Sequence, residues 1–257
     1  MKNDLITLYV VNKDHEKFLN QCLLSIENQS YNNIELIIID DDSSDNSIQL
    51  IQNFKFKKIK KIKFFFNKKS LGLVKNINKV IKVANGKFIL RLDSDDFLRT
   101  NALKKLSKEI KKHKATMVFP NFFKINSKSK IISTFDYNYK KFCNIKDEPA
   151  HGACNLINLD FLKKINGYNS KFKHQDGHYL WYSLFKKKCK IIFLKENLFY
   201  YRQHKKNISK NEKRILYSRL KIINFFIKQN LWFNDVLKKK KTTTLNSLKK
   251  ISTYKEI

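Results

Sequence analysis

Glycine and proline are scarce in this 257-residue chain, which contains only 5 and 2 of them respectively. This scarcity excludes collagen-like repeats, proline-rich linkers and glycine-rich disordered segments. Long apolar runs are also missing, because no stretch approaches the roughly 18 apolar residues that a membrane-spanning helix needs. Residues Met1 to Asp4 lead directly into a strand-like run, so we expect no signal peptide.

Cysteine is sparse as well. The four cysteines, Cys22, Cys143, Cys154 and Cys189, form no C-x-x-C pair and show no zinc-ligand spacing. Their neighbours are apolar, so we expect small, reduced residues of the core. Reduced thiols predict a cytoplasmic location.

Acidic residues are far fewer than basic ones, at 22 against 54, and the formal net charge is +32. The excess lysine is spread along the chain, which fits solvated helix faces. It also fits an electrostatic preference for an anionic membrane or a phosphate-bearing substrate. An RNA-binding protein would interleave aromatic residues with lysine on one exposed sheet face. The aromatic residues here follow core periodicity instead, so we expect no nucleic-acid partner.

The first half of the chain alternates short apolar runs with amphipathic segments, and its hydrophobic fraction of 42% suffices for a core. Near-continuous apolar strands indicate a parallel sheet with helices on both faces. We therefore predict an α/β fold with a Rossmann-like, mainly parallel sheet, whose ligands bind at the carboxyl ends of the strands. Gly86 is expected to cap the third helix. The predicted strands are 5–11, 34–39, 62–66 and 88–92, and the helices are 18–26, 48–54 and 74–84.

The second half is less regular. We predict helices at 102–113 and 176–187, strands at 117–125, 130–135, 190–194 and 198–202, and a strand turning into a helix at 156–165. From about residue 211 onward a basic amphipathic segment follows. We expect it to pack back onto a catalytic domain of residues 1–205, with membrane-surface binding as the alternative for the extension 206–257. Residues 242–257 are expected to be loosely ordered.

One acidic cluster, Asp93-Ser94-Asp95-Asp96, directly follows a predicted buried strand. Side chains alternate along extended backbone, so two carboxylates that flank one residue point the same way. Hard oxygen ligands at this spacing suit Mg²⁺ or Mn²⁺, which in turn binds a diphosphate. The competing interpretation is a solvated acidic turn before the helix near Thr100.

A second pair, Asp40-Asp41, closes another buried strand. In a wound sheet we expect it to lie beside the strand that ends at Asp93. Clustered negative charge repels itself and needs a cation or hydrogen-bond donors to hold it. Two such clusters indicate a metal-assisted ligand site more specifically than either does alone.

The ordered set of motifs resembles family 2 glycosyltransferases of GT-A fold, over about residues 4 to 205. The pattern includes an apolar strand that runs into Asp-Asp-x-Ser, the acidic cluster described above, and a late Tyr-Arg-x-His. One departure is Asp42, which stands where the family usually has glycine. The matching segments are Asn12, Phe18-Leu19, 22–26, Gln29, 34–47, 71–73, Asn78, 84–89, 92–96, Gly152, 165–168, Gln175-Asp176 and 201–204.

The resemblance implies an inverting, metal-dependent glycosyltransferase that uses a nucleotide-diphosphate sugar, with UDP expected as the nucleotide. It implies that Asp41 contacts the nucleobase, with Asp40 in the same nucleotide-sugar site. Asp93 is expected at the ribose or the metal, and Asp95 as the main ligand of Mn²⁺ or Mg²⁺. Lys75 is expected in the nucleotide-sugar site.

The resemblance also implies that Asp176 is the general base that takes the proton of the acceptor hydroxyl. Arg202 is expected in the nucleotide-sugar site, and His204 is expected at the metal. The acceptor is expected to be a glycan or a lipid-linked sugar in cell-surface polysaccharide, lipopolysaccharide or other glycan synthesis. This predicts a cytoplasmic protein with peripheral association at the inner face of the cell membrane.

A nucleotidyltransferase is the competing enzyme class, because it shares a similar scaffold and metal carboxylates. Such enzymes usually carry a glycine-rich basic loop after the first strand. Residues 10–15 contain no glycine, which argues against this class.

Overall fold

The computed structural model describes residues 4–136, 142–147, 152–172, 176–205, 207 and 211–253. The first half alternates strands and helices as predicted, with boundaries within two residues of the expected ones. Continuous apolar runs such as Ile37 to Ile39 are buried on both faces of the sheet, as parallel strands require. The elements are β1 (Ile6–Asn12), α1 (Glu16–Glu27), β2 (Ile34–Asp40), α2 (Ser47–Asn53), β3 (Lys61–Phe66), α3 (Leu73–Val83) and β4 (Phe88–Asp93).

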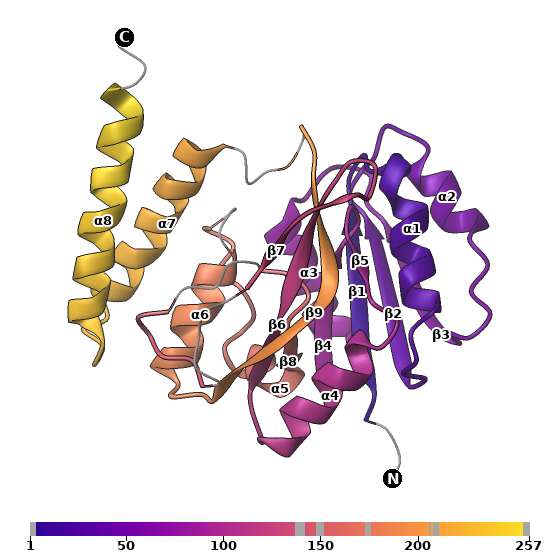
Figure 1. Cartoon of the computed structure of the whole chain (residues 1–257), viewed down its shortest axis with the longest axis horizontal. Coiled ribbons are helices and arrows are strands. Elements are labelled where there is room, and N and C mark those ends of the chain that lie inside the picture. Colours follow the sequence, from indigo (N-terminus) through magenta and orange to yellow (C-terminus); the bar gives the residue numbers. More distant parts are fainter. Residues whose placement is uncertain are drawn as a thin grey trace.

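The second half contributes strands of very unequal length and the remaining helices (Figure 1). Two predicted strands, 190–194 and 198–202, form one long strand, because β9 pairs with β6 on both sides of an irregularity near Asn197. The two-residue strand β5 had no sequence signal. The elements are β5 (Phe97–Leu98), α4 (Ala102–Lys112), β6 (Met117–Asn126), β7 (Ile131–Phe135), β8 (Leu156–Asn158), α5 (Leu159–Lys164), α6 (Asp176–Lys186), β9 (Ile191–Gln203), α7 (Glu212–Ile227) and α8 (Asn234–Thr253).

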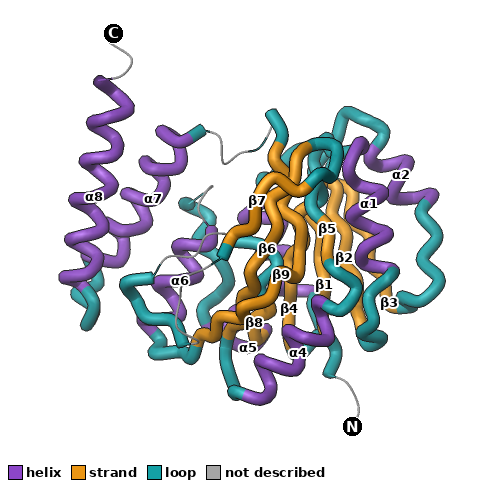
Figure 2. Tube along the Cα trace, viewed as in Figure 1, coloured by secondary structure: helices purple, strands orange, loops and turns teal. Residues whose placement is uncertain are grey.

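Nine strands form one sheet in the order β3-β2-β1-β4-β8-β6-β9-β5, and β7 pairs with β6. The pairs β1/β2, β1/β4, β2/β3 and β6/β9 are parallel, and the remaining pairs are antiparallel. Helices cover both faces, with α3 and α5 behind the sheet in the view of Figures 1 and 2. The predicted α/β fold with a mainly parallel sheet is confirmed.

The two acidic strand ends are not direct neighbours, contrary to the prediction. Strand β1 lies between β2 and β4, so Asn12 pairs with Asp40 on one side and Val11 pairs with Asp93 on the other. The two clusters therefore share one edge of the sheet, separated by the width of a strand.

Gly86 does not cap α3, which ends at Val83. A Cβ at Gly86 would lie 2.5 Å from the backbone nitrogen of Thr7, so the close approach of the turn to β1 explains this glycine. The same turn is held by the buried carboxylate of Glu35. It accepts hydrogen bonds from Thr7, Lys63 and the backbone and side chain of Asn85.

The C-terminal helices pack onto the domain, as expected. Figure 2 shows α7 and α8 side by side at one end of the molecule, next to α6. Buried residues of α7 and α8, including Phe226 and Leu237, belong to the same hydrophobic core as the sheet. The prediction of a loosely ordered tail is wrong for the described residues, because α8 continues to Thr253.

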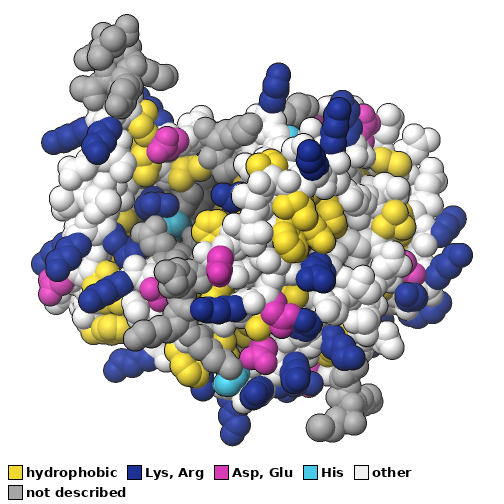
Figure 3. Space-filling model, viewed as in Figure 1, with side chains coloured by type: hydrophobic (Ala, Val, Ile, Leu, Met, Phe, Trp, Pro, Cys, Tyr) yellow, Lys and Arg dark blue, Asp and Glu magenta, His cyan; other side chains and the backbone are white. Residues whose placement is uncertain are grey.

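The lysine and arginine side chains are scattered over the whole visible face in Figure 3, in agreement with the spread seen in the sequence. All four cysteines are free. Cys22 and Cys154 are buried as predicted, whereas Cys143 and Cys189 are only partly buried. Among the described residues, no helix combines the length and apolarity needed to cross a membrane.

Candidate functional site

The strand order predicts a ligand crevice at one edge of the sheet. The strand order reverses at β1, because the chain runs outward from β1 through β2 to β3 and then crosses back to β4 on the other flank of β1. Ligands of open α/β sheets bind at such a switch point, outside the carboxyl ends of the strands. Here those ends carry Asn12, Asp40 and Asp93.

Asp40 is fully buried behind this edge. Its Oδ2 accepts hydrogen bonds from Asn12 Nδ2 at 2.8 Å and Ser43 Oγ at 2.7 Å. Its Oδ1 accepts one from the backbone nitrogen of Ser43 at 2.9 Å. The carboxylate thus holds the loop after β2 onto the end of β1. Its predicted place in the nucleotide-sugar site stays a prediction.

Asp41 holds a second loop, between β3 and α3. Its carboxylate accepts hydrogen bonds from the side chains of Asn67 and Ser70 and from the backbone nitrogens of Leu71 and Gly72, all between 2.8 and 2.9 Å. Burial opposes ionisation, but these donors outweigh it and lower the pKa of Asp41 to about 2. The side chain is therefore a fixed anion at the crevice.

The loops after β1 and β2 are linked by reciprocal hydrogen bonds. The backbone nitrogen of Glu16 donates to Asp45 Oδ2 at 3.0 Å, and that of Asn46 donates to Glu16 Oε2 at 2.8 Å. Asp14 Oδ1 accepts from the backbone nitrogen of Ser44 at 2.7 Å. This linkage fixes the start of α1, and with it the residue that precedes Glu16.

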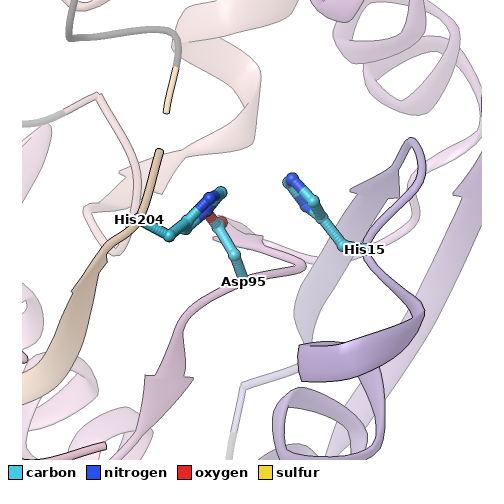
Figure 4. Close-up of side chains that lie close together, drawn as sticks. All are labelled: His15, Asp95 and His204. Carbon is cyan, nitrogen blue, oxygen red and sulfur yellow. The ribbon is translucent and has the colours of Figure 1, made fainter. Parts of the chain in front are cut away.

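That residue is His15, which completes a cluster that could hold a metal ion. His15, Asp95 and His204 each offer one ligand atom, and these atoms lie within 4.8 Å of one another. Figure 4 shows the imidazole of His204 against the carboxylate of Asp95, with His15 facing both from the loop after β1. His204 Nε2 lies 2.9 Å from Asp95 Oδ2. Three segments far apart in sequence thus meet at the crevice.

The three side chains are held in place by their neighbours. His15 Nδ1 lies 2.8 Å from Ser94 Oγ, which leaves Nε2 as the ligand atom of this imidazole. The Phe18 ring packs 5.1 Å from that of His204. Burial opposes the charge of Asp95, but the hydrogen bond from His204 and the positive potential of both imidazoles hold its pKa below the usual value.

This donor set fits a divalent cation. One carboxylate oxygen and two imidazole nitrogens suit Mn²⁺, which accepts both ligand types, better than Mg²⁺, which prefers oxygen. Asp95 and His204 were predicted as metal ligands. His15 was missed, because a histidine three residues after a strand has no periodic or spacing signal.

The other two carboxylates of this cluster have different partners. Asp93 Oδ1 lies 3.0 Å from Nε of Arg91, which is nearly buried, and the Asp93 side chain is 30% exposed. Asp96 is buried, and burial together with repulsion from Asp95 and Asp93 raises its pKa well above the usual value. Its surroundings therefore disfavour ionisation of Asp96. The role of Asp93 at the ribose or metal stays a prediction.

Arg202 lies beneath the cluster. Its backbone nitrogen donates to Asp96 Oδ1 and its Nε to the carbonyl of Asp95, both at 2.8 Å. Its Nη1 donates to Ser129 Oγ at 3.0 Å, and its Nη2 donates to Gln21 Oε1. A guanidinium that is buried and bonded in this way positions the Asp95 backbone. Contact of Arg202 with the nucleotide-sugar stays a prediction.

Two further predicted residues lie apart from the cluster. Lys75 is exposed in the first turn of α3, just after the loop that Asp41 holds. Asp176 begins α6, as predicted, and its side chain lies outside the described part of the chain. Gly177 next to it packs against Gly152, because a Cβ there would lie 3.3 Å from the Gly152 Cα.

The sequence model described as Glycosyl transferase family 2 matches residues 6–165. An uncharacterized glycosyltransferase of Haemophilus influenzae is 43% identical over 105 residues, which are 41% of this chain and 42% of that protein. The chain thus spans less than half of that relative.

The Escherichia coli protein WfgD, named UDP-Glc:alpha-D-GlcNAc-diphosphoundecaprenol beta-1,3-glucosyltransferase, is 27% identical over 243 residues, covering 90% of each chain. The mannosyltransferase PcManGT from Pyrobaculum calidifontis, solved with GDP-Man and Mn²⁺, superposes with a TM-score of 0.71. It is 11% identical and covers 92% of this chain and 68% of its own. This likeness confirms the predicted GT-A fold.

Proposed function

This chain belongs to glycosyl transferase family 2, and from that premise we propose that it moves a sugar, with inversion, from a nucleotide-diphosphate sugar to an acceptor hydroxyl. Its family makes it a glycosyltransferase, and the alternatives of a nucleotidyltransferase and an RNA-binding protein fall away. The observation that carries the proposal is the cluster of His15, Asp95 and His204 at the switch point of the sheet.

We propose a UDP-sugar as the donor. The name of the Escherichia coli relative WfgD states UDP-Glc as its donor. In this chain Asp41 is a fixed anion at the crevice and suits the N–H groups of a base. Asp93, partly exposed, suits the hydroxyls of a ribose. The proposed nucleotide-sugar site also includes Lys75, in the first turn of α3, and Asp40, which is buried at the end of β2.

His15, Asp95 and His204 are proposed to hold Mn²⁺ or Mg²⁺, with Asp93 as a further ligand. A bound divalent cation would neutralise the charge that develops on the leaving diphosphate. Arg202 keeps the Asp95 backbone in place through its Nε hydrogen bond. Burial raises the pKa of Asp96 and so disfavours a further negative charge in the site.

Asp176 is the proposed general base, placed at the start of α6. It takes the proton of the acceptor hydroxyl while the acceptor oxygen forms a bond to the anomeric carbon. The bond between that carbon and the diphosphate oxygen breaks on the opposite side, so the configuration inverts. The nucleoside diphosphate leaves with the bonding electron pair.

The proposed acceptor is a sugar on a lipid diphosphate, used in cell-surface polysaccharide synthesis. The name of WfgD states such an acceptor, a sugar linked through diphosphate to undecaprenol. A lipid-linked acceptor places the enzyme at the cytoplasmic face of the membrane. The basic charge of +32 suits peripheral association with anionic lipids there.

The test compares the protein with Asp176→Asn. A thermal-shift panel of nucleoside diphosphates and nucleotide-sugars, with and without Mn²⁺, identifies the donor first. Transfer to a lipid-diphosphate sugar is then measured, with the anomeric configuration read by NMR. We expect the variant to lose transfer and keep donor binding. Loss of donor binding in Asp176→Asn, or a retained configuration in the product, contradicts the proposal.

A further inference from the structure

A groove of about 600 Å³ lies between the segment before α6 and the first half of α7. It is separate from the metal-ligand cluster, because none of its lining residues belongs to that cluster. Figure 1 shows α6 and α7 next to each other. The groove is lined by Lys171, Phe172, Asn211, Lys213, Arg214, Tyr217, Ser218 and Lys221.

One face of α7 forms a wall of this groove. Lys213, Tyr217 and Lys221 are spaced four residues apart, so they lie on the same side of the helix. All three are exposed, whereas Ile222 and Phe226 point into the core. The face with Lys213, Tyr217 and Lys221, which we call the basic stripe, is therefore not the face that holds α7 to the domain.

The opposite wall is anchored to α6. The ring of Phe172 lies 5.8 Å from that of Tyr179 in α6 and 5.4 Å from that of Phe225 in α7. These contacts fix Lys171 beside the basic stripe. The contact of Phe172 with Tyr179 places the groove beside the first half of α6, the helix that begins at Asp176, the proposed base.

The charge of the groove has one sign. Its lining contains four cations, Lys171, Lys213, Arg214 and Lys221, and no carboxylate. Within the described part of the chain, none of the four forms an ion pair. Cations that face one another repel unless an anion enters between them. Phosphate oxygens accept hydrogen bonds from both guanidinium and ammonium groups.

We propose that this groove binds the diphosphate of the lipid-linked acceptor, an inference that rests on the proposed function. The four cations meet the diphosphate oxygens, and Phe172 and Tyr217 contact the first apolar units of the lipid. The sugar on the diphosphate then extends toward the start of α6. The groove sets the acceptor class, while the crevice of the sheet binds the donor.

The binding test uses geranyl diphosphate, a short lipid diphosphate, measured by calorimetry at low salt. Saturating UDP and Mn²⁺ are present, so that the donor crevice is filled and does not compete. The groove variant carries Lys213→Gln, Arg214→Gln and Lys221→Gln. The matched control carries Lys104→Gln, Lys108→Gln and Lys112→Gln on an exposed stripe of α4, which removes the same charge elsewhere.

We expect the groove variant to bind geranyl diphosphate about tenfold more weakly or worse, and the control to match the unmodified protein. Equal binding by both variants overturns the proposal. Vesicles with anionic phospholipid form a second arm. If the groove variant loses vesicle binding and keeps geranyl diphosphate binding, the groove meets bilayer headgroups and the proposal is also overturned.

A kinetic test separates this inference from the proposed function. With a lipid-diphosphate sugar as acceptor, the groove variant is expected to raise the acceptor KM about tenfold and leave the donor KM unchanged. An unchanged acceptor KM contradicts the groove assignment even when transfer is normal. Absence of transfer by the unmodified protein contradicts the proposed function itself.

Discussion

Asp41 and Asp95 lie at the same edge of the sheet, and both carboxylates are nearly buried. The oxygens of Asp41 accept four hydrogen bonds from the chain itself, two of them from the backbone. Asp95 instead faces His204 and His15, two side chains that we propose as metal ligands. The hydrogen bonds of Asp41 hold a loop and fix its negative charge at the crevice, whereas Asp95, which lies among imidazoles, is available to a cation.

The largest expected effect is that of a substitution at Asp95, the carboxylate of the proposed metal site. Asp95→Asn removes the charge at nearly constant shape, so the two imidazoles lose their anionic partner. We expect transfer to fall by about 100-fold or more and Mn²⁺-dependent UDP binding to be lost, with folding retained. Initial rates and calorimetric titrations of UDP check this. Transfer within a fewfold of normal would show that Asp95 is not at the metal.

The corresponding substitution at Asp41 is expected to lower the stability of the folded protein. Asp41→Asn leaves one acceptor oxygen where the carboxylate has two, and it removes the charge that strengthens the four hydrogen bonds. We expect the free energy of unfolding to fall by about 2–4 kcal/mol. Urea denaturation measures this loss. A stability equal to that of the unmodified protein would mean that the loop from Asn67 to Gly72 does not depend on Asp41.

A pH dependence follows from the carboxylates that the fold stabilises. The pKa of Glu35 and that of Asp41 are both lowered to about 2, because hydrogen-bond donors outweigh burial. Their stabilisation is fully present above the unfolded pKa values near 4 and is lost as the pH falls from there toward 2. Each contributes about 2–3 kcal/mol in this window.

Urea denaturation between pH 6 and pH 2.5 measures this loss. Glu35→Gln serves as the control, because it removes one titrating group and flattens the slope. An equally steep slope in that variant would contradict the assignment of the pH dependence to Glu35.

His15 gives a smaller effect that sharpens the metal assignment. His15→Ala removes one of the proposed ligands and leaves Asp95, His204 and Asp93, so we expect Mn²⁺ affinity to fall about tenfold. The electron paramagnetic resonance signal of free Mn²⁺ reports this affinity. His113→Ala, at the end of α4, is the matched control and is expected to have no effect. Equal Mn²⁺ affinities in the two variants would show that His15 is not a metal ligand.

The smallest effect concerns Asp42, which follows Asp41 and has a φ of 66°. Glycine adopts this left-handed conformation without strain, so Asp42→Gly is expected to stabilise the protein by about 0.5–1 kcal/mol. The exposed ion pair with Lys13 that it removes contributes little. Urea denaturation decides the sign, and a loss of stability would show that the Asp42 side chain holds this loop.

The sequence predicted the first half of the fold well, because its strands are continuous apolar runs and its helices have regular apolar spacing. It missed β5, whose two residues carry no periodicity, and divided β9 at an irregularity near Asn197. A loosely ordered tail was predicted where α8 continues. Runs of lysine and threonine dominate this segment, and only a few apolar residues, such as Leu237 and Leu248, are buried and hold the helix to the domain.

The site was predictable only in part. Asp95 and His204, which the structure brings together, were predicted as metal ligands because their motifs have a fixed order in the family. His15 was not, because its place in the cluster depends on the loop linkage through Asp45 and Glu16. The buried setting of Arg202 likewise depends on contacts with Gln21 and Ser129, which no local pattern reveals.

The central claim is that Asp95, with His15 and His204, holds a cation that binds the nucleotide diphosphate. Its most direct test is calorimetric titration of UDP into the unmodified protein and Asp95→Asn, with Mn²⁺ and with EDTA. The account predicts that Mn²⁺ tightens UDP binding by about tenfold or more in the unmodified protein and has no effect in the variant. Binding that is equally tight in EDTA, or equally metal-dependent in Asp95→Asn, would contradict it.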